Sequence, residues 1–335
     1  MFNNKNVLIT GGTGSFGTRF VDIVLRRYRP KKLIVFSRDE FKQSQMAKKY
    51  PSVIDDPKSK FPIRYFLGDV RDANRLITAF RDVDYVIHAA ALKQVPSLEY
   101  NPSEAIKPNI LGAENVINAA LYNRVKKVIA ISTDKAVNPI NLYGASKLCA
   151  DKLITASNFY SGNIGTTFSV VRCGNVLNSR GSIIPSLLEE RTKGTISITD
   201  KRMTRFWITL DQFSNFVLDC LKIMKGGEIF IPKIPSMHVL DLAKIVAPDA
   251  KVRFVGMRWG EKLHEVLVPR DESTHTLEAR DMYIIQTPYT YLKEYYRHNG
   301  KYKKVPDKFK YSSDTNSRWL TQEQLKKYLK IERIA

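Results

Sequence analysis

The stretch VLITGGTGSFG (residues 7–17) joins a short apolar run to three glycines, Gly11, Gly14 and Gly17. VLIT predicts a buried strand, and the residues after the glycines predict a helix. Gly11 permits a tight turn, Gly14 lets the backbone approach a pyrophosphate, and Gly17 allows close contact between helix and strand. The free N–H groups at the start of the helix favour phosphate. A glycine pattern alone can be a flexible turn, but this strand–turn–helix context predicts a dinucleotide site.

Beyond this stretch, short strands alternate with amphipathic helices through the first two thirds of the chain. The predicted strands are residues 7–10, 32–36, 62–66, 84–90, 127–132 and 168–172. The predicted helices include residues 18–28, 73–80 and 110–123. The strands are rich in Val, Ile and aromatic residues, as expected when both faces of a sheet are covered. The alternation predicts an α/β fold with a doubly wound parallel sheet of the Rossmann type.

After about residue 175 this rhythm loosens. Residues 182–194 and 210–225 predict helices, separated by short strands such as EIFIP (228–232). We interpret residues 1–175 as the dinucleotide-binding domain and 176–335 as mainly a smaller α/β lobe that binds substrate. Some of the chain is expected to cross back to the first domain.

The composition is that of a globular protein with an unusually basic surface. The chain has 335 residues, 43% of them hydrophobic, and no apolar run of the length that a membrane span needs. The first residues enter a strand without a signal peptide, so we expect a cytoplasmic protein. Three widely spaced cysteines without a CxxC predict no disulfide frame or zinc site. The five histidines have no metal-ligand spacing, so no metal is expected.

A net charge of +21 favours anionic partners such as nucleic acid, an acidic membrane face or phosphorylated substrates. The basic residues are spread along the chain, and the dense patch is KEYYRHNGKYKKVPDKFK (293–310). We interpret that patch as a solvated tail or an oligomer contact and expect no nucleic-acid partner. A phosphorylated substrate and cofactor explain part of the charge, not all of it.

The end of the second strand, VFSRDE (35–40), lies where a dinucleotide site contacts the adenosine ribose. A carboxylate there is typical of NAD sites and an arginine of NADP sites. Ser37 and Arg38 come first and Lys42 follows one helical turn later, which favours NADP, although Asp39 argues for NAD. At the end of the third strand, Asp69 and Val70 are candidates to border the adenine.

The stretch ISTDKAVNPINLYGASK (131–147) follows the fifth strand, and ligands bind beyond the carboxyl ends of parallel strands. Tyr143 and Lys147 are spaced i, i+4 and therefore share one helix face. An ammonium near a phenol lowers its pKa, so Tyr143 can remove a hydroxyl proton while hydride leaves the same carbon. Lys147 can also bond the nicotinamide ribose. Asp134 and Lys135 add an acid and an amine at the same edge of the sheet.

These motifs resemble those of the extended short-chain dehydrogenase/reductase family, which acts mostly on nucleotide sugars. One branch is especially similar, the UDP-N-acetylglucosamine 4,6-dehydratases that invert C5 and start pseudaminic acid and some capsular sugar pathways. The motifs that carry the resemblance are TGGTGSFG (10–17), SRDE (37–40), HAAALKQVP (88–96), STDKAVNPINLYGASK (132–147), RMTRFW (202–207) and RWGEKLHE (258–265). The resemblance runs from about residue 5 to residue 290.

The resemblance implies roles for the site residues. Related dehydratases that retain the C5 configuration carry an Asp–Glu pair where this chain has Asp134–Lys135. After oxidation at C4, Lys135 would act at C5 and Asp134 would assist loss of the 6-hydroxyl, with Tyr143 taking the O4 proton and Thr133 bonding O4. A neutral Lys135 needs a lowered pKa, which we expect beside Lys147 and an oxidised nicotinamide. Inversion would give an L-arabino 4-keto sugar.

Two sets of binding residues follow from the motifs and the resemblance. The expected cofactor contacts are Gly11, Thr13, Gly14, Ser15, Phe16, Gly17, Ser37, Arg38, Lys42, Asp69, Val70, Ala89, Ala90, Lys93, Tyr143 and Lys147. The expected UDP-sugar contacts are Lys93, Thr133, Asn175, Arg180, Arg205, Arg258 and Glu261, with Arg172 as a weaker candidate. Asn109 is expected to hold the active-site loop, and the family usually forms homo-oligomers.

Two other functions remain open from the sequence. A UDP-sugar 4-epimerase on the same scaffold needs Tyr143, Lys147 and the cofactor, but no acid and base at 134 and 135. A non-catalytic NADP-sensing or nucleic-acid-binding regulator needs neither Tyr143 nor Lys147. The Asp134–Lys135 pair therefore favours the dehydratase over the epimerase.

Overall fold

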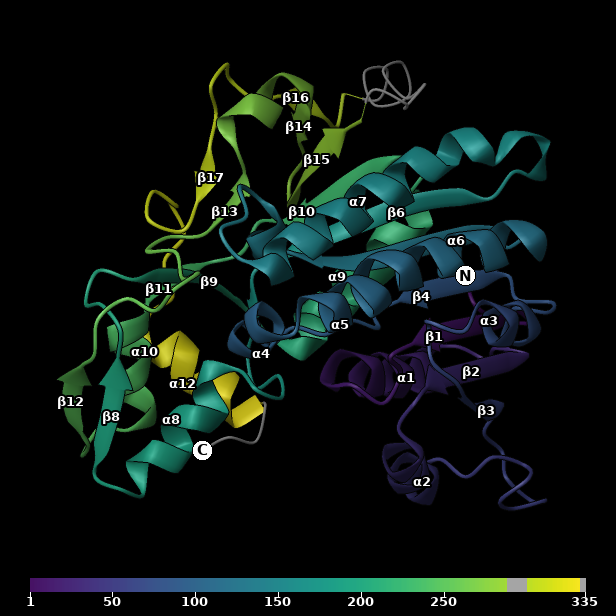
Figure 1. Ribbon diagram of the computed structural model, residues 1–335, viewed down its shortest axis with the longest axis horizontal. Helices are drawn as coiled ribbons and strands as arrows, with labels where there is room; N and C mark the ends of the chain where they lie inside the picture. Colours follow the sequence, from purple (N-terminus) through teal and green to yellow (C-terminus); the bar gives the residue numbers. More distant parts are fainter. Residues whose placement is uncertain (288–299, 332–335) are drawn as a thin grey trace.

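A ten-stranded sheet forms the centre of the computed structural model, which describes residues 1–287 and 300–331 (Figure 1). In spatial order its strands are β16 (Lys303–Lys304), β14 (Thr276–Glu278), β15 (Met282–Gln286), β10 (Glu228–Pro232), β6 (Thr167–Cys173), β5 (Lys127–Thr133), β4 (Tyr85–His88), β1 (Asn6–Thr10), β2 (Lys32–Ser37) and β3 (Ile63–Leu67). Neighbouring strands run parallel from β3 to β10, and β15, β14 and β16 extend the sheet antiparallel. The predicted doubly wound sheet is confirmed.

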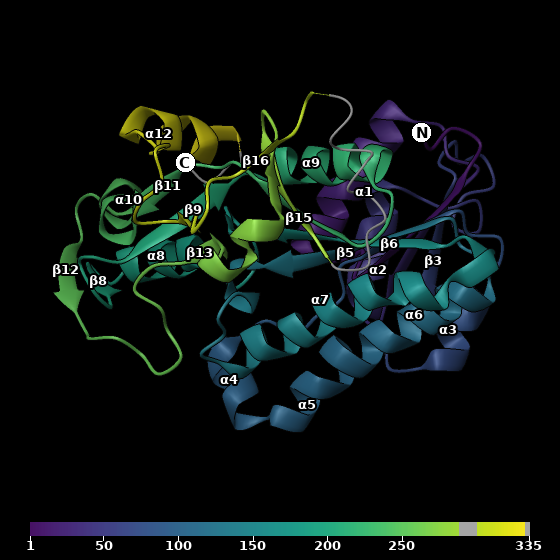
Figure 2. The same ribbon diagram turned by 90° about the horizontal axis from the view of Figure 1, so that it is seen from above.

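Helices cover both faces of this sheet (Figure 2). Helices α3 (Ala73–Ala79), α6 (Gly112–Tyr122) and α7 (Leu142–Tyr160) pack side by side on one face, and α1 (Ser15–Arg27) and α9 (Leu210–Ile223) pack together on the other. The remaining helices and helical turns near the sheet are α2 (Glu40–Lys49), α4 (Val95–Tyr100), α5 (Pro102–Ile106), the π-helical η1 (Lys107–Leu111), and the 3₁₀ turns η2 (Asp134–Ala136), η3 (Gly162–Ile164) and η4 (Arg270–His275). Because both faces are covered, every residue of β1 is buried.

Strand β10 corrects one expectation from the sequence. Residues 228–232 were expected in the smaller lobe, but β10 pairs parallel with β6, with Ile229 beside Val170. Strands β15 and β14 continue the same sheet beyond it. An isolated apolar run carries no signal of its pairing partner, so the sequence could not place β10 next to a strand about sixty residues earlier.

A smaller lobe lies beyond the carboxyl end of the parallel strands (Figure 1). It contains helices α8 (Ile183–Arg191), α10 (Val239–Val246) and α12 (Gln322–Ile331) and three small sheets. Their strands are β7 (Asn175–Val176), β9 (Thr204–Ile208) and β11 (Ser236–His238); β8 (Thr195–Ile198) and β12 (Lys251–Phe254); and β13 (Val266–Val268) and β17 (Tyr311–Ser312). The last pair adjoins the main sheet, since Leu267, Val268 and Tyr311 belong to the main apolar core. This lobe has its own apolar core, which includes Trp207, Leu242 and Leu325. A domain boundary near residue 175 stays a prediction.

Other expectations concern the surface. Part of the basic patch at 293–310 lies outside the described residues, while its residues 303–304 form the edge strand β16. None of the helices in residues 1–287 and 300–331 has the length and apolar character of a membrane span. Within the same ranges, no group of three or more His, Cys, Asp or Glu side chains is arranged to hold a metal ion.

Candidate active site

Three adjoining cavities open along the carboxyl ends of the parallel strands. The central cavity, about 390 Å³, lies between the glycine-rich turn, the start of α7 and residues 173–182. The strand-end cavity, about 250 Å³, lies at the ends of β2 and β3, and the lobe cavity, about 350 Å³, lies between η2 and the smaller lobe. The central cavity shares Gly11 and Gly14 with the strand-end cavity, and Lys93 and Lys135 with the lobe cavity. The three therefore form one groove.

The glycine-rich turn borders the first two cavities. Gly11 has φ +65°, and a Cβ there would lie 2.9 Å from backbone atoms of Ala90. A Cβ on Gly17 would lie 2.6 Å from the backbone of Gly12, so α1 can start immediately behind the turn only with a glycine. Gly14 precedes α1 with no side-chain cap, which leaves N–H groups of its first turn for a ligand. The turn fits the diphosphate of a dinucleotide.

The strand-end cavity holds the residues expected around the adenosine. Thr13, Ser37, Arg38, Asp39, Lys42, Asp69, Val70, Ala89 and Ala90 all line it. The hydroxyls of Thr13 and Ser37 lie 2.7 Å apart, and Asp39 caps α2 by accepting from the Lys42 N–H at 2.9 Å. Hydrogen bonds from the Lys42 amine and N–H hold the pKa of Asp39 below its usual range. Arg38 lies 3.7 Å from Asp69.

Helix α7 brings Tyr143 and Lys147 to the central cavity. Asn141 caps the helix by accepting from the Gly144 N–H at 2.8 Å, and its amide donates to the carbonyl of Gly260 at 2.8 Å. A Cβ on Gly144 would lie 2.1 Å from the carbonyl oxygen of Lys135. The glycine therefore allows η2 to pack against α7 and places residues 134–135 next to Tyr143.

The expected lowering of the Tyr143 pKa is not found. Burial raises the pKa of Tyr143 to about 12, although the ammonium of Lys135 and the hydroxyl of Thr133 work in the opposite direction. Burial also lowers the pKa of Lys147, which the carboxylate of Asp151 partly offsets. Lys135 is therefore the ammonium that acts on the phenol in this structure. The i, i+4 spacing of Tyr143 and Lys147 carries no information about the position of Lys135, so the sequence could not indicate this role.

Asp134 and Lys135 form an ion pair at the junction of the central and lobe cavities. The Lys135 amine donates to Asp134 Oδ1 at 3.0 Å, and the Thr133 hydroxyl donates to the same oxygen at 3.0 Å. Asp134 is fully buried, whereas a quarter of the Lys135 side chain is exposed. The second oxygen of Asp134 has no hydrogen-bond partner among the described residues. Asp134 lines none of the three cavities, so Lys135 is the member of the pair that faces the groove.

The pKa of Lys135 is shifted upward, whereas the sequence led us to expect a lowered pKa. Burial disfavours its ammonium, but the carboxylates of Asp134 and Glu265 outweigh burial and hold the pKa of Lys135 well above its usual range. Glu265 lies 3.4 Å from the Lys135 amine and comes from the segment before β13. The expected lowered pKa is wrong for this structure because a second carboxylate, about 130 residues away in the chain, faces the amine.

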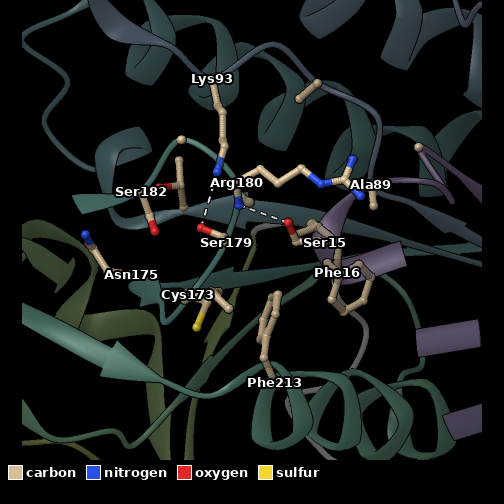
Figure 3. A pocket seen from close by; sticks show the side chains of 18 of the residues that line it. Ser15, Phe16, Ala89, Lys93, Cys173, Asn175, Ser179, Arg180, Ser182 and Phe213 are labelled. Atoms are coloured by element: carbon tan, nitrogen blue, oxygen red, sulfur yellow. Dashed lines mark hydrogen bonds between the residues drawn. The ribbon is translucent and has the colours of Figure 1, made fainter. Parts of the chain in front are cut away.

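The loop after β4 and the loop 176–182 cover the central cavity (Figure 3). Asn109, buried in η1, holds the first loop: it accepts from the Leu92 N–H at 2.8 Å and donates to the Leu92 carbonyl at 3.0 Å. The Lys93 amine donates to the Ser179 hydroxyl at 3.3 Å, and the Arg180 N–H donates to the Ser15 hydroxyl at 3.0 Å. The two loops and the glycine-rich turn therefore meet over the groove.

The expected UDP-sugar contacts separate into two groups. Asn175, Arg205, Arg258 and Glu261 line the lobe cavity with Lys93, and Thr133 lines the central cavity. Arg180 lines the central and strand-end cavities instead and extends toward Ala89 in Figure 3. It therefore lies on the side of the groove that holds the glycine-rich turn.

Two arginines have their guanidinium groups engaged by the protein. Arg205 is buried and donates to the carbonyls of Thr204, Lys262 and Leu263. Arg172 is 1% exposed, donates to Glu272 at 2.9 Å, and lines none of the three cavities. Arg172 is thus not placed to meet a phosphate. Its position at the end of β6 suggested the site, but its side chain turns into the protein.

Several lining residues were not predicted. Glu265 and Lys262 belong to the same RWGEKLHE segment in which only Arg258 and Glu261 were chosen. Gln94 lines the central and lobe cavities, and a Cβ on Gly181 would lie 2.0 Å from its side-chain nitrogen. The number of charged residues in the segment was a signal, but nothing in it indicated which side chains point inward.

Comparisons with known proteins match most or all of the chain. Residues 7–287 match the model of the polysaccharide biosynthesis protein family. The UDP-N-acetylglucosamine 4,6-dehydratase (inverting) of Campylobacter jejuni is 51% identical over 333 residues, which cover 97% of each protein. A UDP-glucose 4-epimerase of Rickettsia bellii is 43% identical over 293 residues, covering 85% of this chain and 84% of the relative.

A solved structure also matches the whole chain. The X-ray structure of Pen from Bacillus thuringiensis has a TM-score of 0.90 and 38% identity, and the match covers 100% of both chains. Together with the family match, the shared length excludes a likeness confined to the glycine-rich turn. The chain belongs to the polysaccharide biosynthesis protein family, on the branch of the extended short-chain dehydrogenases/reductases that contains the inverting UDP-N-acetylglucosamine 4,6-dehydratases.

Proposed function

We propose that this protein is a UDP-N-acetylglucosamine 4,6-dehydratase that inverts C5. Its product would be UDP-2-acetamido-2,6-dideoxy-β-L-arabino-hexos-4-ulose. The observation that carries the proposal is the Asp134–Lys135 pair, an acid and an amine 3.0 Å apart, whose amine lines the groove together with Tyr143. The 51% identity to the Campylobacter jejuni enzyme over nearly the full chain supports the same reaction.

We infer that the central and strand-end cavities take NADP. Arg38, Lys42 and Arg180 line the strand-end cavity around Asp39, whose carboxylate already accepts from Lys42. Three cations near the end of β2 suit a 2′-phosphate better than a free 2′-hydroxyl. When bound, the nicotinamide would accept a hydride from C4 of the sugar and return it to C6. Arg180 is therefore reassigned from substrate to cofactor.

Tyr143 would take the O4 proton during oxidation. Its phenol lies in the central cavity with Thr133, whose hydroxyl can orient the same O4. The pKa of about 12 means that the phenol is protonated at neutral pH in this structure. A cationic nicotinamide in the cavity would lower that pKa, since a nearby positive charge favours the phenolate. Lys147, buried one helical turn away, would bond the ribose.

One proton transfer prepares the elimination. Moving a proton from the Lys135 ammonium to the Asp134 carboxylate creates a neutral amine and a neutral acid. The amine then takes the C5 proton, and Asp134 protonates the departing 6-hydroxyl, which leaves as water. Both groups return to their starting charges. The C4 ketone makes this step possible because it acidifies C5. As hydride returns to C6, C5 receives a proton that comes from solvent, delivered to the face opposite the one from which the first proton left.

The lobe cavity would hold the UDP group. Arg258 and Glu261 both line it, and the backbone N–H of Arg258 donates to the Glu261 carboxylate at 3.2 Å. Asn175 faces the central and lobe cavities, and its buried side-chain oxygen has no hydrogen-bond partner among the described residues. Arg258 suits a diphosphate, Glu261 a ribose hydroxyl, and Asn175 a sugar hydroxyl. Lys93 lies between the two cavities.

A second candidate is a UDP-sugar 4-epimerase, which the 43% identity to the Rickettsia bellii protein favours. Both reactions begin with oxidation at C4, so the products separate them. We would incubate the purified protein with UDP-N-acetylglucosamine and examine the product by mass spectrometry and NMR. A 4-keto product lacking one water supports the dehydratase. UDP-N-acetylgalactosamine, with no water lost, contradicts it.

The wider setting follows from this activity as further predictions. The description of the matching family supports a role in the synthesis of surface polysaccharides or glycans, such as a pseudaminic acid or capsule pathway. A cytoplasmic location and a homo-oligomer stay predictions. A non-catalytic regulator would have no use for the charged pair at 134 and 135.

A further inference from the structure

Glu265 is a buried carboxylate that faces Lys135 from the smaller lobe. Its side chain is 2% exposed and lines the lobe cavity. Its Oε1 lies 3.4 Å from the Lys135 amine and 3.7 Å from Nε of Arg205, and its Oε2 lies 3.9 Å from the Lys262 amine. Five charged groups, two carboxylates and three cations, therefore meet at this point once Asp134 is included.

The backbone of Glu265 is fixed to the strand beside it. Its N–H donates to the Ser313 hydroxyl at 2.9 Å, and its carbonyl accepts from the Ser313 N–H at 2.8 Å. The Ser312 hydroxyl donates to the same carbonyl at 3.3 Å. The backbone of Glu265 is therefore anchored at the end of β17 by contacts that do not involve Lys135.

The other two cations have partners without Glu265. Arg205 donates to three backbone carbonyls, and the Lys262 amine donates to the carbonyl of Val137. Within residues 1–287 and 300–331, the side-chain partners of the Lys135 amine are two carboxylates, Asp134 and Glu265. Of the three cations, Lys135 is thus the one that depends most on Glu265.

The contact between Glu265 and Lys135 bears on the reaction proposed above, and the inference rests on that proposed function. When Asp134 carries the transferred proton, it no longer stabilises a charge on Lys135. As the amine takes the C5 proton it becomes an ammonium again, and Glu265 is then the ionised carboxylate beside it. A fixed anion next to a base strengthens that base in the transition state, as the carboxylate of a catalytic triad does for its histidine.

We propose that Glu265 is a positioning residue for the C5 step, which holds the Lys135 amine at the junction of the central and lobe cavities and stabilises the positive charge that the amine gains there. One oxygen of Glu265, Oε2, has no hydrogen-bond partner among the described residues, and the carboxylate is surrounded by its ion pairs with Lys135, Arg205 and Lys262. Burying a carboxylate costs free energy unless neighbouring cations compensate its charge.

Other ionisable groups share this environment. They are Asp134 and Lys135 on η2, Tyr143 on α7, Cys173 at the end of β6, Lys93 on the loop after β4, Arg205 on β9, and Lys262 and His264 before β13. Removing the charge of Glu265 leaves Arg205, Lys262 and Lys93 as repelling neighbours of Lys135. Because repulsion from these cations disfavours the Lys135 ammonium, the Asp134–Lys135 pair in the variant should lose its proton at a lower pH than in the wild type.

The test compares Glu265→Gln, which removes the charge but keeps the shape, with Glu265→Asp, which keeps the charge. We would measure kcat and kcat/KM for dehydration of UDP-N-acetylglucosamine, and C5 deuterium exchange, across pH. Glu278→Gln is the matched control, because Glu278 pairs with Lys233 at 2.6 Å outside the three cavities. We expect Glu265→Gln to lose about 10²-fold in kcat. Its activity should also decline at a lower alkaline pH than in the wild type.

Recovery of the wild-type pH profile by Glu265→Asp, with no effect of Glu278→Gln, supports the proposal. An unchanged pH profile in Glu265→Gln overturns it, whatever the loss of rate, because a merely structural role does not move the profile. If Glu265→Gln does not fold, Glu265→Ala takes its place: an alkaline decline at lower pH than in the wild type supports the proposal, and an unchanged profile contradicts it. Failure of the wild type to dehydrate the substrate would instead contradict the proposed function.

Discussion

A Cβ placed on Gly144 would lie 2.1 Å from the carbonyl oxygen of Lys135. This contact couples the start of α7, which carries Tyr143, to the turn that carries Asp134 and Lys135. The oxidation residues and the elimination residues therefore have a fixed spacing. The coupling is made by backbone packing, so it does not depend on the charges of the side chains.

Gly144→Ala should disturb this spacing. The added methyl group must push η2 away from α7, and we expect a loss of about 1–3 kcal/mol in the free energy of unfolding, typical of overpacking, and a greater than tenfold loss of dehydratase activity. Urea unfolding and a product assay measure the two effects. Gly162→Ala is the control, because its φ of +43° strains an added side chain although a Cβ there meets nothing within 4 Å. Equal activity in the two variants would contradict the coupling.

Lys135→Ala and Tyr143→Phe should stop the reaction at different points. Without the amine, oxidation at C4 can proceed but C5 keeps its proton, so reduced cofactor should accumulate when substrate is added. Without the phenol hydroxyl, oxidation itself should fail and no reduced cofactor should form. Absorbance of the reduced nicotinamide in a single turnover separates the two.

Lys126→Ala is a suitable control for these variants, since its amine pairs with Asp84 at 2.8 Å outside the groove. It should turn over as the wild type does. Full dehydration by Lys135→Ala would show that the base is another residue.

Arg38→Ala should weaken NADP more than NAD. Loss of a charge-assisted contact to the 2′-phosphate should raise the Kd for NADP by about tenfold to a hundredfold, and leave the Kd for NAD within about twofold. Titration calorimetry with both cofactors measures this difference. Arg280→Ala, at an exposed position outside the cavities, serves as the control. Equal losses for both cofactors would argue against a 2′-phosphate site at Arg38.

Asp22 gives a prediction for stability against pH. This buried carboxylate on α1 accepts from Tyr50 and pairs with Arg19 at 3.2 Å and with Arg26. Burial alone raises its pKa, but Tyr50, Arg26 and Lys49 together bring it below the usual value. The stability it contributes is therefore present above the unfolded pKa, about 3.9, and is lost as pH falls through the lower folded pKa.

Asp22→Asn should accordingly lose about 2 kcal/mol of unfolding free energy at neutral pH, and the difference from the wild type should shrink in acid. Urea unfolding of both proteins at neutral pH and in acid, below the folded pKa of Asp22, measures this difference in unfolding free energy. Asp249→Asn, at an exposed carboxylate 3.9 Å from Arg191, should differ little from the wild type at either pH. A loss for Asp22→Asn that does not depend on pH would contradict the assignment.

The sequence predicted the sheet because its strands are short apolar runs that can be recognised locally. VLIT and KVIAIS are apolar on both faces, and the glycines at 11, 14 and 17 mark the first turn. The neighbour of β10 was not predictable, since the apolar run EIFIP would suit either lobe. Pairing partners depend on the whole chain, and a single strand does not encode them.

The candidate site likewise has a part that the local sequence predicted and a part that it did not. Tyr143, Lys147, Asp134 and Lys135 are close in sequence; the structure places Tyr143, Lys147 and Lys135 in one groove and buries Asp134 against Lys135. The pKa of Lys135 is raised by Asp134 beside it in sequence and also by Glu265, which approaches it from a distant part of the chain. The buried side chain of Arg172 shows the opposite error, a charged residue at the right edge of the sheet whose guanidinium turns inward. Orientation and long-range pairing are tertiary properties that local motifs do not carry.

The central claim is that Lys135 and Asp134 carry out an elimination across C5 and C6 with inversion. The most direct measurement is incubation of the wild-type protein with UDP-N-acetylglucosamine in deuterated water, followed by NMR of the product. We predict a 4-keto sugar that has lost one water and carries deuterium at C5 in the inverted configuration. A product with hydrogen retained at C5, or one that keeps its 6-hydroxyl, would contradict the account.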